Sequence, residues 1–246
     1  MSLFSNLFKP AAPAMPAAPK IQPVSVPPIP AQLPKIAAPT AAEIAQTSNP
    51  SPAAQQILAA NPQQTPSQYL NTLQEKQMGG EMAGTLAHGM PDREGVMWAS
   101  QSAEKVSGSL PAEDAQALKA AQAWVKEPTA ANQAAAAAAA AKTNLQGPGA
   151  LAAQGAAWSQ PAAAATPRMT PHAVVGAVLL SAAIKANPSV AMPKVQAAVV
   201  PVLETPQLTS AAPAVIPPAV QAQMFQEQHP FIASGIDIAS GKTPCG

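Results

Sequence analysis

The residues that could do chemistry in this chain are few and far apart. One sequence pattern is similar to that of a phosphate-binding loop and consists of Gly235, Gly241, Lys242 and Thr243. That motif needs four residues between its first glycine and the Gly-Lys pair, and here there are five. It must also lead into a helix whose first amides bind the phosphates, whereas this sequence stops at Gly246. No nucleotide cofactor is therefore expected.

Metal-binding and nucleophilic patterns are equally weak. The three histidines, His88, His172 and His229, are widely separated and have no His-x-x-His or Glu-x-x-His neighbours, so the sequence indicates no metal site. Cys245, the single cysteine, lies beside the last residue, and there is no Gly-x-Ser-x-Gly elbow. The sequence predicts no catalytic residue, no cofactor and no metal, so the protein is not expected to be an enzyme.

Two residue groups are better explained by structure than by chemistry. Asp92, Arg93 and Glu94 form the densest charged cluster, and Asp92 is predicted to cap the start of a helix. The three tryptophans each fall on a different predicted helix and are expected to form the hub of the core, with a ligand cage as the alternative: Trp98, Trp124 and Trp158.

Composition excludes several classes of protein. The formal net charge is +1, and no basic run exceeds one residue, so a nucleic-acid-binding face is not expected. The longest apolar run, residues 173–184, is shorter than a membrane span, and the first residues do not form a secretory signal. A single cysteine allows no intrachain disulfide, which fits a reducing compartment.

Proline and alanine divide the chain into segments. Of 30 prolines, 14 lie before residue 67, and proline disfavours regular helix and sheet. Helical spacing and Gly or Pro breaks recur after residue 65, and no period-two strand pattern is present. The fold class is predicted to be all-α, a small Ala-rich helical bundle with a long Pro/Ala-rich extended N-terminal tail.

The chain is expected to divide into five segments. These are a short amphipathic anchor at 1–10, the tail at 11–65, a helical domain at 66–186, a Pro-rich insertion at 187–228 and a C-terminal docking segment at 229–246.

The N-terminal segments carry the predicted partner-binding residues. The first ten residues place four large apolar side chains on one face of a short helix, which cannot hold itself together in water. Five more apolar residues are threaded among the prolines of the tail, where a polyproline II strand could dock on a protein. A disordered linker and a frayed terminus are the alternatives. The predicted partner contacts are Leu3, Phe4, Leu7, Phe8, Val24, Val26, Ile29, Leu33 and Ile36.

Five short motifs, in order, resemble an uncharacterised family of Ala-rich bacterial proteins. They are Leu86-Ala87-His88-Gly89-Met90-Pro91 with Arg93-Glu94 and Trp98-Ala99; Ala123-Trp124-Val125 with Pro128; Ala156-Ala157-Trp158-Ser159; Thr170 with the run 173–180; and Phe231 with 235–239 and Gly241. The likeness covers roughly residues 65–186 and 229–241. Met97 in place of an aromatic residue, the segment 187–228 and the run of eight alanines depart from the family pattern. The resemblance implies no activity; it implies a genetic neighbourhood of type VI secretion components.

Together these observations predict a non-catalytic structural or adaptor protein of a bacterial secretion or injection assembly, which binds protein partners through its tail. It is expected in the cytoplasm, in a secretion apparatus or in a virion, and membrane contact is not expected. The alternatives are a phage virion structural protein and, as a third class, a small hydrolase of unknown substrate.

Overall fold

The computed structural model describes residues 28–159, 167–187 and 217–242. In these ranges the chain forms ten α-helices and one short 3-10 helix, with no strand. This confirms the all-α prediction. The helices are α1 (Ala41–Ser48), α2 (Pro52–Ala60), α3 (Pro66–Glu75), α4 (Gly79–Gly89), α5 (Asp92–Glu104), α6 (Ala112–Lys126), α7 (Ala130–Ala141), α8 (Pro148–Trp158), α9 (Thr170–Ala186) and α10 (Pro218–Ala239), with the 3-10 turn Ser107–Ser109 after α5.

Helix starts follow directly from local sequence. Thr65 caps α3 in a reciprocal capping box with Gln68, and Pro66 occupies the first turn, where its missing N–H is harmless. Ser51 with Pro52 begins α2, and Thr129 accepts from the Asn132 amide at the start of α7. Proline in this chain therefore starts helices as well as ending them.

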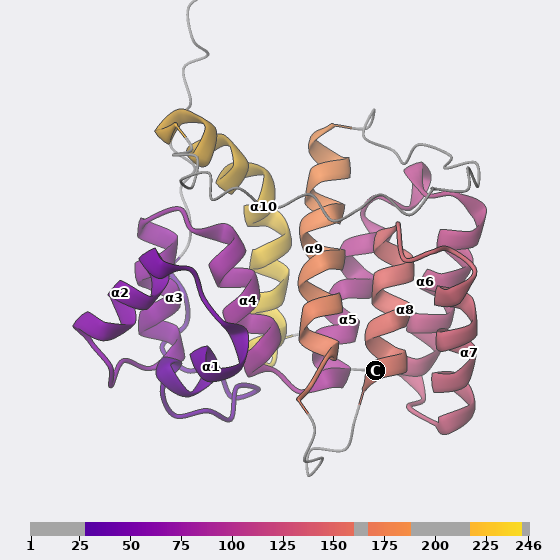
Figure 1. The fold of residues 1–246 in the computed structure, drawn as a ribbon, viewed down its shortest axis with the longest axis horizontal. Coiled ribbons are helices and arrows are strands. Elements are labelled where there is room, and N and C mark those ends of the chain that lie inside the picture. The colour runs from indigo at the N-terminus through magenta and orange to yellow at the C-terminus, as the bar shows by residue number, and fades with distance from the viewer. Residues whose placement is uncertain (1–27, 160–166, 188–216, 243–246) are drawn as a thin grey trace, which may run out of the picture.

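Helices α5 to α9 form the main bundle, in which α8 contacts α5, α6, α7 and α9. Figure 1 shows α10 beside α4 and α9, with α1 to α3 gathered on the far side of α4. Small side chains allow the helices to approach closely: Ala136 and Ala140 of α7 are fully buried, as are Ala152, Ala153 and Ala156 of α8. The alanine run is thus an interface as well as a strong helix former.

The predicted segment boundaries differ from the structure on both sides of the domain. Residues 41–60, expected in an extended tail, form α1 and α2, and Ile44 and Leu58 join the core. Residues 218–228, expected in an insertion, begin α10. Short helices are unstable alone. Helix α1 is stabilised by packing against α4, and α2 by packing against α3. The local sequence pattern does not reveal this packing.

The tryptophan hub is only partly correct. Trp98 is fully buried and Trp124 nearly so, and both belong to the core cluster. Trp158 is half-buried at the end of α8 and lies outside that cluster. The core is instead shared among aliphatic side chains such as Leu70, Leu86 and Ile232.

Candidate functional site

The candidate site lies where the α4–α5 turn meets the ends of α6 and α8 and the start of α9. Helix α4 ends at Gly89, and Met90 and Pro91 turn the chain into α5. A side chain at Gly89 would come within 3.1 Å of Ile36 and Ile44, so this turn favours a residue without a Cβ. Asp92 does not cap α5 as predicted: Pro91 holds the cap position and Asp92 is the first helical residue.

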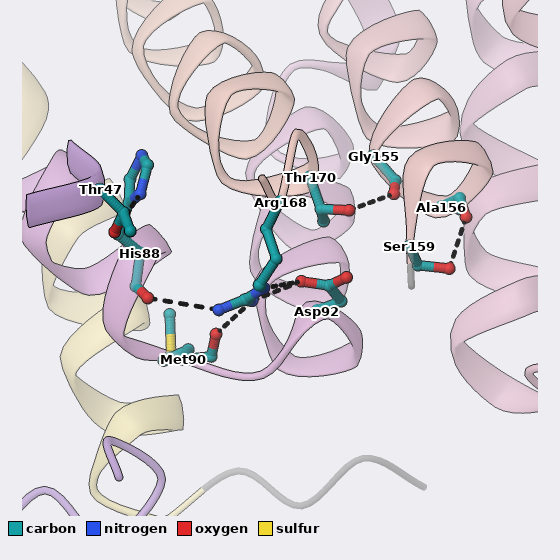
Figure 2. A network of polar contacts seen from close by, with 9 residues as sticks. All are labelled: Thr47, His88, Met90, Asp92, Gly155, Ala156, Ser159, Arg168 and Thr170. Atoms are coloured by element: carbon teal, nitrogen blue, oxygen red, sulfur yellow. Dashed lines mark hydrogen bonds and ion pairs between the residues drawn. The ribbon is translucent and has the colours of Figure 1, made fainter. Parts of the chain in front are cut away.

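Arg168 joins the start of α9 to this turn. Figure 2 shows its guanidinium between the α4–α5 turn and Asp92. Its Nε donates to Asp92 Oδ1 at 2.9 Å, one terminal nitrogen also reaches Asp92 Oδ1, and the two terminal nitrogens donate to the carbonyls of His88 (3.4 Å) and Met90 (2.8 Å). The Asp92 side chain is 8% exposed, so this ion pair is largely removed from water and its geometry is fixed by charge-assisted bonds.

Arg93 likewise donates hydrogen bonds to the carbonyls at the end of α6. Its Nε donates to the carbonyl of Val125 at 2.8 Å, and a terminal nitrogen donates to that of Lys126 at 3.4 Å. The last carbonyls of a helix have no partner inside the helix and carry partial negative charge. The only two arginines of the sequence thus serve as caps for two helix ends.

These residues line a surface pocket of about 540 Å³. Both arginines and Lys35 contribute positive charge to its wall, and Asp92 is the one acidic residue among the lining residues. The exposed apolar surface comes from Ala37, Pro91 and Pro128, while Met90 and Trp124 lie buried behind it. Gln133, also in the wall, donates to the carbonyls of Ala157 (3.1 Å) and Ser159 (2.9 Å), which ties α7 to the end of α8.

Two of the three histidines lie together beside this site. The rings of His88 and His172 are in edge-to-face contact, with centroids 4.9 Å apart. His88 Nδ1 lies 3.2 Å from Thr47 Oγ1 (Figure 2), and because that hydroxyl donates to Ile44 O, the ring nitrogen is the donor. Burial, followed by His172 and Arg168, lowers the pKa of His88 to about 4, so His88 is neutral at pH 7. Within the described ranges, no three His, Cys, Asp or Glu side chains gather as metal ligands would.

The predicted partner-binding residues fall into two groups, those outside the described residues and those buried in the core. Leu3, Phe4, Leu7, Phe8, Val24 and Val26 lie outside the described residues. Ile29, Leu33 and Ile36 are 6%, 8% and 9% exposed and belong to the core. The prediction that these three residues contact a partner from a free tail is therefore wrong. Residues 28–38 run across the domain, which covers these side chains itself.

The first glycine of the phosphate-loop-like pattern has a packing explanation. Gly235 lies inside α10 against the indole ring of Trp98. Lys242 Nζ pairs with Asp237 Oδ1 at 3.0 Å, and Thr243 lies outside the described residues. No helix follows Gly241 within the described part of the chain.

Arg168 is a site residue that the sequence does not predict, because it stands in a Pro/Ala-rich stretch typical of a linker. The available signal is that this stretch contains one of only two arginines.

A comparison with protein families places this turn and this bundle in context. A family of unknown function, DUF6931, matches residues 69–202, which is more than half of the chain. The protein is a member of the DUF6931 family. The match contains Asp92, Arg93 and Arg168, and it agrees with the expected uncharacterised family; the closing motif at 231–241 lies beyond it. No curated protein and no solved structure matches the chain.

Proposed function

We propose that this DUF6931 member is a non-catalytic structural or adaptor protein that holds protein partners in a larger assembly. The observation that carries the proposal is the packing of residues 28–38. This Pro-containing segment lies on the domain without forming a helix, and it buries one apolar side chain every three or four residues. It is held by polar contacts as well: Ile29 N donates to Asn71 Oδ1 at 3.3 Å, and Lys35 N donates to Ala239 O at 3.0 Å.

The packed segment supports a binding mode for the residues before it. Val24 and Val26 continue the pattern of apolar residues between prolines, and the four large apolar residues of 1–10 precede them. An extended Pro-containing strand docks at low entropic cost because it is already stiff. In the proposal, residues 28–38 bind their own domain and residues 1–27 bind a partner in the same manner.

The polar site also favours binding over catalysis. Arg93, Arg168 and Gln133 direct their hydrogen bonds at backbone carbonyls of helix ends, which is a structural use of these groups.

In the described ranges, no helix is both long enough and apolar enough to cross a membrane. The family resemblance to proteins encoded beside type VI secretion components supports that apparatus as the first assembly to test.

The test separates the anchor from the body. The full chain and a variant lacking residues 1–27 are compared in pull-downs from a lysate of the native host. A third chain carries Leu3→Gln, Phe4→Gln, Leu7→Gln and Phe8→Gln. We expect partner recovery with the full chain only, with the same melting transition in all three. Equal recovery by all three chains would contradict the tail proposal. Deletion must stop before residue 28, because the residues that follow belong to the core.

A further inference from the structure

We infer that the pocket between the α4–α5 turn and the ends of α6 and α8 binds an acidic peptide segment of a partner protein. This site is separate from residues 1–27 and goes beyond the adaptor role proposed above. It rests on the charge of the pocket, the rigidity of its cations and the exposed apolar residues of its wall.

The wall carries more positive than negative charge. Lys35, Arg93 and Arg168 line it beside one lining carboxylate, Asp92, and Glu94, which pairs with Lys35 from outside the lining, is only 12% exposed. Lys35 pairs with Glu94 at 3.1 Å but its side chain remains 42% exposed, and that of Arg168 is 37% exposed. Exposed cations with low-dielectric walls beside them attract anions more strongly than cations in open water.

The cations are also held in place before any ligand arrives. Arg93 is fixed by the end of α6 and Arg168 by the end of α4 together with Asp92. The Lys35 ammonium is held by Glu94, whose Oε1 lies 3.1 Å from Lys35 Nζ. Side chains that are already ordered lose little conformational entropy on binding, so preorganised charges contribute more to affinity.

The apolar part of the wall distinguishes a peptide from a simple anion or a nucleic acid. Ala37, Pro91 and Pro128 are exposed apolar residues of the wall, and Trp124 lies behind them at 6% exposure. A segment with an apolar side chain next to Asp or Glu would satisfy both parts of the pocket, since its carboxylates meet the cationic side chains. A phosphate backbone would need a longer row of positive charge than three residues supply, and an inorganic anion would leave the apolar part of the wall unused.

Ala37 provides a clean test because it lines the pocket, is exposed and has no side-chain hydrogen bond to lose. A displayed library of random short peptides is selected on the full chain, and the enriched peptides are synthesised. Their affinities are measured by fluorescence anisotropy on the unmodified chain, on Ala37→Glu and on the matched control Ala37→Gln. We expect enrichment of Asp and Glu beside an apolar residue. Ala37→Glu should weaken binding about tenfold or more, Ala37→Gln should bind almost as the unmodified chain does, and affinity should fall as salt is raised.

Several results would overturn the inference. These are no enrichment of acidic peptides, equal affinity of the two Ala37 variants, or binding of inorganic phosphate or a single-stranded oligonucleotide as tight as that of the selected peptides. Repeating the anisotropy measurement on the chain lacking residues 1–27 separates the two proposals. The pocket should bind unchanged there, whether or not the tail proposal holds.

Discussion

The indole Nε1 of Trp98 donates a 2.8 Å hydrogen bond to the carbonyl oxygen of Phe231, which lies 133 residues later in the sequence. The same ring lies against Gly235, one helical turn further along α10, where an added Cβ would be 2.6 Å from Trp98 Cε2. The bond requires α10 and α5 to approach closely, and the missing side chain of Gly235 permits it.

Gly235→Ala is therefore expected to lower the free energy of unfolding, by roughly 1–3 kcal/mol, because a buried ring must move to admit one methyl group. Gly84→Ala is the matched control. It also lies inside a helix, but a Cβ added there would meet no atom within 4 Å, so it should stabilise by about 0.5–1 kcal/mol. Urea unfolding of both variants checks the prediction, and effects of the same sign would contradict it.

Trp124→Ala should destabilise the protein by roughly 3–5 kcal/mol, since Trp124 is only 6% exposed and its removal leaves a cavity. Trp158→Ala should cost clearly less, because that ring is half-buried. Thermal melting followed by circular dichroism measures both. An unmoved transition for Trp124→Ala would show that this part of the packing is wrong.

Arg168→Gln is expected to lower the free energy of unfolding by roughly 2–4 kcal/mol. The change removes charge-assisted hydrogen bonds and leaves the largely buried Asp92 carboxylate without its cationic partner Arg168. Lys242→Gln removes an ion pair whose two side chains are 63% and 48% exposed, and should cost less than about 1 kcal/mol. A double-mutant cycle of Arg168→Gln with Asp92→Asn should show coupling between the two residues. Strictly additive effects would mean that the pair contributes little.

Acid should weaken the fold through His88. In the folded protein burial lowers its pKa to about 4 from the ordinary 6.5, so between these values the unfolded chain binds more protons than the folded one. The free energy of unfolding then decreases as pH falls from about 6.5 toward 4, on the order of 3 kcal/mol in all, and this contribution is constant above pH 7. Burial also lowers the pKa of His229, which adds in the same direction.

The measurement is urea unfolding across this pH range. His88→Gln should flatten part of the pH dependence, leaving the parts due to His229 and to Asp114, whose pKa is raised by burial. A variant with the same pH profile as the unmodified chain would rule out His88 as its source.

Ile36→Ala should destabilise by roughly 2–5 kcal/mol, since Ile36 is buried against Gly89 in the core. The same change in an unattached tail would have no effect on unfolding. Gln32→Ala, at an exposed position of the same segment, is the control and should leave the melting transition in place. If both variants melt like the unmodified chain, residues 28–38 do not contribute to the folded body.

The sequence predicts the structure best where a local rule decides it. Thr65-Pro66 and Thr170-Pro171 mark helix starts, and helices begin at Pro66 and at Thr170. The same rule applies at Ser51-Pro52, where Pro52 sits in the first turn of α2. There the many surrounding prolines favour an extended tail instead, and that prediction is wrong.

The candidate site is harder to predict because its parts come from distant places in the chain. Arg168 meets Asp92, 76 residues away, and Met90, 78 residues away. No periodicity in a window around Arg168 reports such a partner. Likewise, apolar residues among prolines fit an extended strand whether it is free or docked. The burial of Ile29, Leu33 and Ile36 depends on surfaces formed by α3, α4 and α10.

The bond from Lys35 N to Ala239 O brings the first and last parts of the folded body together. During synthesis the chain leaves the ribosome from its N-terminus, so residues 28–38 emerge long before α10 can receive them. Until α10 follows, Trp98 lacks its acceptor and Ile232 is absent from the core. Completion of the fold thus waits until α10 has been synthesised, and a chain cut short before α10 would expose apolar surface that proteases and chaperones recognise.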